Sequence, residues 1–270
     1  MIDRTFQLIR GVGPAREKEL WCRGVKTWDD LPRNEIALSA KQDPPLRAAI
    51  EVARAALAAG DPGALTAMIP SRERWRMLAP FGAEAAYLDI ETDGTHADAQ
   101  VTCVGVLHRG RVRAFVSGFN LHQFPAFAAE LQLLVTFNGS CFDVPVLERF
   151  FPGLRLPRAH IDARFAARRA GLDGGLKRLE GELGLTRPPG LRGVGGADAV
   201  ALWHAWRHAR DRTALRKLVT YNLYDAVLLE PVMARLVNRM RERALSGAPL
   251  VPERPARDSL AEIDRVSGAF

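Results

Sequence analysis

The sequence is poor in cysteine and has no long uninterrupted hydrophobic stretch. Its three cysteines, Cys22, Cys103 and Cys141, are odd in number and scattered, with no CxxC spacing. This usage indicates neither a disulfide framework nor a zinc site. No apolar run approaches the length that spans a membrane, and the N-terminal MIDRTFQLIRG lacks the apolar core of a secretion signal. We therefore expect a cytoplasmic protein with reduced thiols and no membrane partner.

The charge balance is moderately basic. The 270 residues include 38 lysines and arginines against 31 aspartates and glutamates, a formal net charge of +7. Such a balance suits a polyanionic partner, and many proteins with other partners share it, so it supports nucleic-acid binding without establishing it. The length allows one large domain, or a main domain with a small appendage.

The middle of the chain has the pattern of strands and the rest that of helices. Three β-rich runs separated by short polar turns predict an antiparallel meander at 85–92, 101–108 and 111–118. Further strands are expected at 133–137 and 158–162. Helical patterns cover 124–131, 163–170, 175–184, 197–208 and 212–243. Three strands followed by strand–helix alternation predict an α/β fold, a mixed sheet with parallel strands beside the meander and helices packed on it.

The two ends are expected to differ from this central part. Residues 1–66 read as a helical region, followed by an irregular connector at 67–84. The domain with the mixed sheet is expected over 83–243. The tail, 246–270, begins with three prolines at regular intervals and is predicted to have little fixed structure.

Two of these elements place carboxylates in apolar surroundings. In AYLDIETDG, Asp89 and Glu91 lie two residues apart on a strand, so the alternation puts them on one face. In YNLYDAVLL, Tyr221 and Asp225 lie four residues apart on a helix and also share a face. Burying unpaired carboxylates is very costly, and a divalent metal ion would be a sufficient partner. The pattern therefore points towards phosphodiester chemistry.

A third segment, VTFNGSCFDVPVL with Asn138 and Asp143, completes a recognisable set. D-x-E at 89–91, N-x(3)-F-D at 138–143 and Y-x(3)-D at 221–225 match, in order and spacing, the motifs of DEDD-type 3′–5′ exonucleases. The chain resembles in particular the YprB-like, ribonuclease H-like family. Thr220 stands where the histidine subtype has its histidine, so the resemblance selects the tyrosine subtype, DEDDy. It covers about residues 83–240.

The resemblance implies a ribonuclease H-like fold and a two-metal mechanism with Mg²⁺ or Mn²⁺, for which hard oxygen ligands are suited. It implies that Asp89 bridges both ions and that Glu91, Asp143 and Asp225 complete the coordination. Tyr221 would hold the nucleophilic water, a role that needs orientation more than proton abstraction. Asn138 would hydrogen-bond the substrate or steady the turn of its motif.

Each motif taken singly has an ordinary structural explanation, and only their joint order and spacing favour the site. The predicted function is a 3′–5′ exonuclease on single-stranded or frayed nucleic acid, with DNA favoured and RNA open. An endonuclease on the same fold and a non-catalytic nucleic-acid-binding protein are the alternatives. Nearby, Asp162 is expected to cap the helix that follows it. Lys177 and Arg178 either meet backbone phosphate or form a solvated basic face.

The N-terminal sequence resembles a helix-hairpin-helix motif at about 5–31. TFQLI is expected to form a first helix, GVG a tight turn, and the segment from Pro14 to Gly24 a second helix. Glycines let the backbone approach a phosphate, so we expect contacts to nucleic acid from Gly11 and Gly13, supported by Arg10, Arg16 and Lys18. A protein-binding or purely structural hairpin is the alternative.

Overall fold

A five-stranded mixed sheet lies at the centre of the structure, a computed structural model that describes residues 1–32, 37–244, 248, 250–253 and 256–270. The strand order is β3-β2-β1-β4-β5. The meander consists of β1 (Ala85–Thr92), β2 (Val101–His108) and β3 (Arg111–Val116). Next to β1, β4 (Leu133–Thr136) and β5 (Ala159–Asp162) pair in parallel. This arrangement confirms the predicted α/β fold class and mixed sheet.

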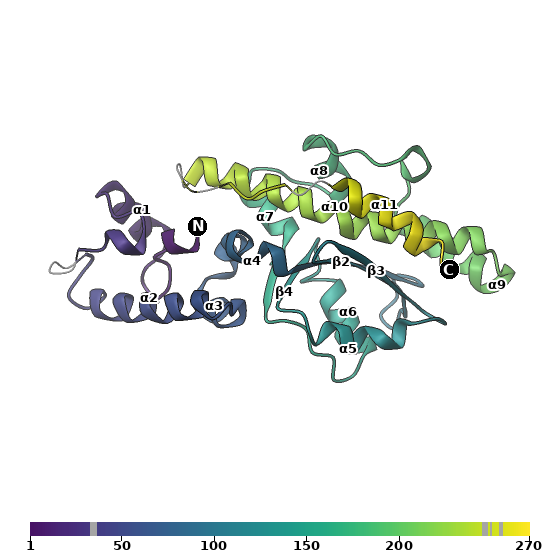
Figure 1. Cartoon of the computed structure of the whole chain (residues 1–270), viewed down its shortest axis with the longest axis horizontal. Coiled ribbons are helices and arrows are strands. Elements are labelled where there is room, and N and C mark those ends of the chain that lie inside the picture. Colours follow the sequence, from purple (N-terminus) through teal and green to yellow (C-terminus); the bar gives the residue numbers. More distant parts are fainter. Residues whose placement is uncertain (33–36, 245–247, 249, 254–255) are drawn as a thin grey trace.

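The two faces of the sheet are covered by different helices because side chains alternate along each strand. On β1, Ala86, Leu88 and Ile90 join the core formed with α5 (Phe124–Ala128) and α6 (Asp143–Phe150). The intervening Ala85 and Tyr87 join the other core, which includes α10 (Arg212–Ala244). Figure 1 shows α10 running along one side of the sheet, with α5 and α6 on the other. Asp89 and Glu91 continue the α10-facing series.

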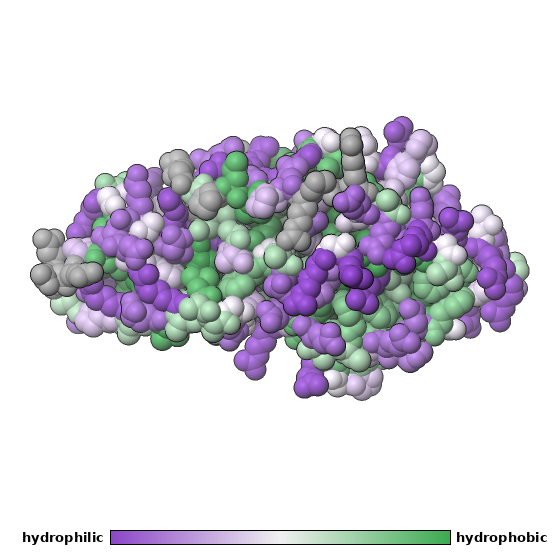
Figure 2. All heavy atoms as spheres, viewed as in Figure 1, coloured by the Kyte–Doolittle hydropathy of each residue, from purple (hydrophilic) through white to green (hydrophobic). Residues whose placement is uncertain are grey.

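Shorter helices surround α10. They are α7 (Ala163–Arg169), α8 (Leu176–Glu182) and α9 (Gly196–Ala209), and each contacts α10. Their bounds lie within one or two residues of the predicted ones, as expected where apolar residues repeat at helical spacing. Figure 2 shows one face of the molecule, where hydrophilic side chains are spread over both ends with hydrophobic patches between them. Within the described part of the chain, no helix has both the length and the apolar character needed to cross a membrane.

The N-terminal region is helical, but its first predicted helix is absent. It contains α1 (Pro14–Cys22), α2 (Asp43–Ala58) and α3 (Pro62–Met68), whereas residues 5–9 form no helix. Side chains from outside this segment bind two of its backbone groups. Glu17 accepts from the Phe6 amide at 2.9 Å, and the Trp28 indole donates to the Thr5 carbonyl at 2.6 Å. The helix-hairpin-helix prediction is therefore wrong in this element.

The hairpin residues that were predicted to contact nucleic acid lie in different environments. Gly11 has a φ of +88°, and its carbonyl accepts a hydrogen bond from the Gln42 side chain at 3.1 Å. Gly13 caps α1 with open space where a side chain would stand. Arg10 and Lys18 are exposed. Their contact with nucleic acid stays a prediction.

The connector at 67–84 is more regular than predicted. It consists of the end of α3, two 3-10 turns at Ser71–Met77 and Gly82–Glu84, and α4 (Leu78–Phe81). The fully buried Arg76 orders this segment, because it pairs with Glu73 at 2.9 Å and with Glu17 of α1 at 3.3 Å. Buried ion pairs of this kind are invisible to local sequence patterns, so the segment read as irregular.

The C-terminal tail also departs from the prediction, since its described residues include α11 (Ala256–Ser267). Ser259 and Ile263 are buried at helical spacing, and Leu260 and Val266 pack on the same core. Glu262 accepts a hydrogen bond from the Val112 amide of the edge strand β3 at 3.0 Å. The prolines precede this helix rather than interrupt it. The remaining tail residues, 246–247, 249 and 254–255, lie outside the described part.

Candidate active site

Three carboxylates meet where β1 faces α10. Oxygen atoms of Asp89, Glu91 and Asp225 all lie within 4.8 Å of one another. Two come from alternate positions of one strand and the third from the helix packed on that face. Glu91 and Asp225 are buried, and Asp89 is partly exposed. The structure thus brings together carboxylates that the sequence separates by more than 130 residues.

Asn222 fixes Asp89 from α10. Its side-chain amide donates to the Asp89 carboxylate at 2.8 Å, and its oxygen accepts from the Cys103 thiol at 3.2 Å. Gly105, the register partner of Asp89 on β2, makes room for this contact. A Cβ atom at position 105 would lie 2.4 Å from the Asn222 oxygen. Close approach of the helix to the sheet therefore depends on this glycine.

Asp143 lies next to the group of three rather than inside it. It is the first residue of α6 and is buried. Its charge contributes to raising the pKa values of Asp89 and Glu91, which places it in the same electrostatic environment. Of the four predicted ligands, three are therefore brought within 4.8 Å of one another and the fourth adjoins them.

The loop before Asp143 is held by Asp162. The Asp162 carboxylate accepts from the backbone amides of Asn138 at 2.8 Å, Ser140 at 3.0 Å and Arg164 at 3.0 Å. The last bond caps α7, as predicted from the sequence. Asn138 has a φ of +63°, a left-handed conformation that asparagine tolerates better than most residues, and its side chain accepts from Arg164 at 2.6 Å. Asn138 thus steadies the turn of its motif.

Tyr221 lies one helical turn before Asp225, and its ring is buried. Its hydroxyl accepts a hydrogen bond from the Lys177 ammonium at 2.6 Å, and the same ammonium lies 4.6 Å from the ring centroid. Lys177 comes from α8, whereas its neighbour Arg178 pairs with Glu182 at 2.8 Å. Of the two basic residues singled out in the sequence, Lys177 therefore faces the site and Arg178 makes a local helix pair.

A buried cation adjoins the carboxylates and was missed by sequence reasoning. Arg187 forms ion pairs with Asp225 and, at 2.5 Å, with Glu180 of α8. Arg187 stands in a proline-rich loop with no catalytic motif, so no local signal marks it. Glu180 could have been found, since it completes a G-L-K-x-x-E pattern with Gly175 and Lys177.

Burial and mutual repulsion dominate the electrostatics of the site. Burial raises the pKa values of Asp89 and Glu91 well above the ordinary range, and the neighbouring carboxylates, Asp225 foremost, raise them further. Burial also raises the pKa of Asp143 to about 7, against opposing hydrogen bonds from backbone amides. Burial disfavours the Arg187 cation, but its contacts with Glu180 and Asp225 outweigh this and raise its pKa. The carboxylates therefore repel one another unless cations join them.

Comparison with known families decides the superfamily of this fold and site. A family model for the RNase_H superfamily matches residues 86–237, more than half of the chain. The chain belongs to the ribonuclease H superfamily. No curated protein matches it. Membership in this superfamily implies a nuclease that hydrolyses phosphodiester bonds of nucleic acid with divalent metal ions, and this confirms the coarse function predicted from the sequence.

The donor set of this ribonuclease H superfamily member fits such a metal. Carboxylate oxygens are the ligands that Mg²⁺ and Mn²⁺ prefer, and three converge here from two rigid elements. Burial and the neighbouring carboxylates raise the pKa values of Asp89 and Glu91, and a dication would offset this concentration of negative charge. Asp89, Glu91 and Asp225 would hold the metal directly, with Asp143 beside them.

Proposed function

We propose that this member of the ribonuclease H superfamily is a DEDDy-type 3′–5′ exonuclease on single-stranded or frayed nucleic acid, with DNA favoured. The observation that carries the proposal is the convergence of Asp89, Glu91 and Asp225 with Tyr221 one turn away on α10. This combination supports the tyrosine subtype, because the hydroxyl and the carboxylates share one site. Asp143 adds a further buried carboxylate beside this group, at the start of α6.

In the proposed mechanism Asp89, Glu91 and Asp225 would hold divalent metal, which would supply activation of water and charge stabilisation at the leaving 3′ oxygen. The protein supplies the geometry. Asn222 holds the Asp89 carboxylate in one orientation, and Arg187 holds that of Asp225. Lys177 adds a positive charge beside Tyr221, where a phosphate of the strand would be attracted. These cations also reduce the repulsion among the carboxylates before the metal binds.

Tyr221 acts as an orienting hydroxyl rather than as a base. Burial raises its pKa, and the negative charges of Asp225, Glu91 and Asp89 raise it further, so the phenol stays protonated at neutral pH. A neutral O–H group can donate to or accept from a water molecule but does not abstract its proton. The role predicted from the sequence therefore agrees with this environment.

Replacing Tyr221 with phenylalanine is expected to lower the turnover rate by roughly 10²-fold, the range for a positioned acid–base group. The ring and its packing remain, so the melting temperature should change little. Single-turnover hydrolysis of an end-labelled oligonucleotide measures the rate. Tyr224→Phe, three residues along the same helix, is the matched control. Normal turnover in Tyr221→Phe together with loss in Tyr224→Phe would show that the tyrosine assignment is wrong.

The proposed function predicts a defined product pattern and a metal requirement. With Mn²⁺, a single-stranded DNA labelled at its 3′ end should lose the label first, and a 5′-labelled strand should shorten stepwise. Chelation should abolish both reactions. Parallel RNA strands test the preference for DNA. Internal fragments without stepwise shortening would instead indicate an endonuclease, and a stable complex without products would indicate a binding protein.

A further inference from the structure

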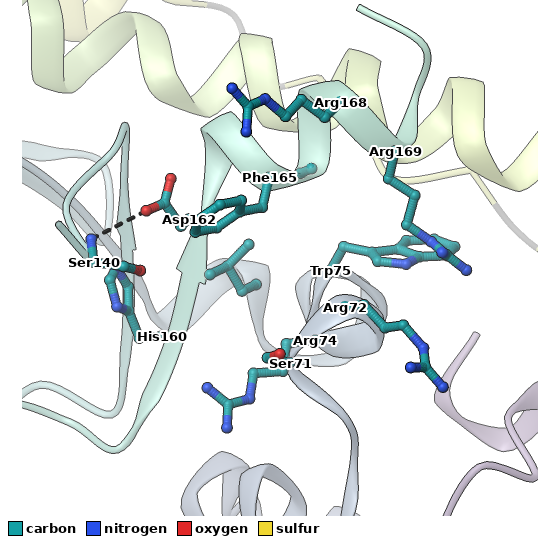
Figure 3. A pocket seen from close by; sticks show the side chains of 12 residues that line it. Ser71, Arg72, Arg74, Trp75, Ser140, His160, Asp162, Phe165, Arg168 and Arg169 are labelled. Carbon is teal, nitrogen blue, oxygen red and sulfur yellow. Dashed lines mark hydrogen bonds between the residues drawn. The ribbon is translucent and has the colours of Figure 1, made fainter. Parts of the chain in front are cut away.

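An arginine-lined cavity of about 440 Å³ lies at the β5 edge of the sheet. Its walls come from the 3-10 turn at Ser71–Met77, from β5 and from α7. Figure 3 shows Phe165 between Asp162 and Trp75, with Ser71 and Arg74 on the opposite wall. This volume is within the range of pockets that take small organic ligands, about 300–1,000 Å³. The Ser71–Met77 turn precedes the part of the chain that matches the superfamily, residues 86–237.

The cavity carries an excess of positive charge. Four arginines line it, namely Arg72, Arg74, Arg168 and Arg169. Arg169 pairs with Glu73, and Arg168 reaches Asp173 at 3.4 Å on the surface. Arg72 donates to the neutral amide of Gln7 at 2.8 Å. Among the described residues, Asp162 is the one carboxylate in the lining, and it already accepts three backbone amides.

Arg74 differs from the other three arginines because it has no hydrogen-bond acceptor among the described residues. Its side chain is partly buried, and within the described residues no acceptor or carboxylate pairs with it. Its Nε atom is shielded from solvent without a hydrogen-bond partner, as is the indole nitrogen of the adjacent Trp75. Unpaired buried donors are uncommon in folded proteins and call for an explanation. The terminal nitrogens of the same guanidinium are not shielded in this way, so a phosphate in the cavity can pair with them, as guanidinium groups do well.

The cavity also offers an aromatic surface. The Phe165 side chain on α7 is 49% exposed and lines the cavity. An exposed phenylalanine beside unneutralised arginines is the combination that single-strand-binding grooves use, because a base stacks on the ring while the cations hold the backbone. Neither a simple anion nor an apolar ligand would use both features.

The cavity adjoins the proposed active site through one short loop. Ser140 lines the cavity, and its amide is bound to Asp162 at 3.0 Å. Three residues later the same loop reaches Asp143 at the start of α6. Between them Phe142 presents a second exposed aromatic side chain. A strand whose end lies at the carboxylates could therefore continue along this loop to the cavity.

We propose that this cavity binds a nucleotide of the substrate strand away from the scissile bond, with a phosphate on Arg74 and a base stacked on Phe165. The proposal rests on the proposed function for the position of the strand end. It assigns to the segment before the superfamily domain a part in holding nucleic acid, through Arg72 and Arg74. Substrates too short to reach the cavity should not benefit from it.

The test separates strand binding from turnover. Binding of a fluorescent oligothymidylate of about 20 nucleotides, longer than one strand-binding site, is measured by anisotropy with chelator over a salt series. Arg74→Gln is expected to weaken binding about tenfold and to flatten the slope of log affinity against log salt by ~0.7, as for one lost phosphate contact. Phe165→Leu should also weaken binding about tenfold but leave the slope unchanged.

Arg111→Gln is the matched control, because Arg111 is an exposed arginine on β3, at the opposite edge of the sheet. It should bind like the wild type. Equal effects of Arg74→Gln and Arg111→Gln, or no effect of either, would overturn the proposal. A third result would also overturn it: thymidine monophosphate saturates the cavity, but Arg74→Gln does not change strand binding. The cavity would then bind free nucleotide and not the strand.

Turnover assays keep this proposal distinct from the proposed function. With Mn²⁺, Arg74→Gln should raise the KM for the long strand and leave both kcat and the hydrolysis of a dinucleotide unchanged. Stepwise 3′ hydrolysis with an unchanged KM would contradict nucleotide binding in the cavity but support the proposed exonuclease activity. Strand binding that depends on Arg74, without any hydrolysis, would support nucleotide binding in the cavity and contradict the proposed exonuclease activity.

Discussion

Asp89→Asn is expected to lower the hydrolysis rate by at least about 10³-fold, since bound metal contributes several kcal/mol of charge stabilisation and 1.36 kcal/mol is tenfold. The substitution keeps the side-chain volume and an oxygen that can accept from Asn222. It removes one negative charge from a group in which carboxylates raise one another's pKa values. The metal-free variant should therefore melt no lower than the wild type at neutral pH. Single-turnover kinetics and thermal melting measure the two effects.

Asp98→Asn is the matched control for the loss of one charge. Asp98 stands nine residues later in an exposed loop and lies outside the group of three carboxylates. Its substitution should leave the rate unchanged. Full activity in Asp89→Asn would exclude Asp89 as a metal ligand, and unfolding of that variant would show that the carboxylate has a structural role.

Without metal, the protein is expected to lose stability as the pH rises. Asp143 has a folded-state pKa of about 7, and burial raises those of Asp89 and Glu91 as well. Free aspartate and glutamate titrate near 3.9 and 4.3, so between about pH 4 and pH 7 the folded state binds more protons than the unfolded state. Stability then falls with rising pH across this window. For Asp143 alone the loss is on the order of 4 kcal/mol.

Divalent metal should oppose this trend, because it binds the deprotonated carboxylates. At a concentration 100-fold above its dissociation constant, a ligand of the folded state adds about 2.7 kcal/mol. The rise in melting temperature with Mn²⁺ should therefore be larger at about pH 8 than at about pH 5. Asp143→Asn should flatten the pH dependence of the chelated protein. A melting temperature that climbs with pH in chelator would contradict the assignment of these raised pKa values.

Local patterns were enough to predict the strands, and which side chains of β1 and of α10 share a face. Alternation along β1 places Asp89 and Glu91 on the face that α10 covers, and helical spacing places Tyr221 and Asp225 on one side of α10. Both relations hold within a single element, so they do not depend on the rest of the fold. The capping role of Asp162 was predictable for the same reason.

Features that depend on distant contacts were not predictable. Arg187 reaches Asp225 across 38 residues of chain, and nothing in its own loop indicates a partner. Residues 5–9 were predicted to form a helix, but Glu17 binds the Phe6 amide and Trp28 takes the Thr5 carbonyl, which a helix would have used. The helix α11 packs on α10 and on the edge strand β3, where Glu262 accepts from a backbone amide. Sequence periodicity contains no information about such partners.

The position of α10 also determines how the site behaves when the protein fluctuates. This helix contacts the three meander strands as well as α7, α8, α9 and α11, and it carries Tyr221, Asn222 and Asp225. Its backbone amides should exchange with deuterium only when most of the molecule opens, placing them among the slowest in the chain. The Ser140 amide, in a surface loop, should exchange through local opening at a lower free energy. The half of the site on α10 is thus expected to persist as long as the fold itself, while the loop before Asp143 can open and close independently.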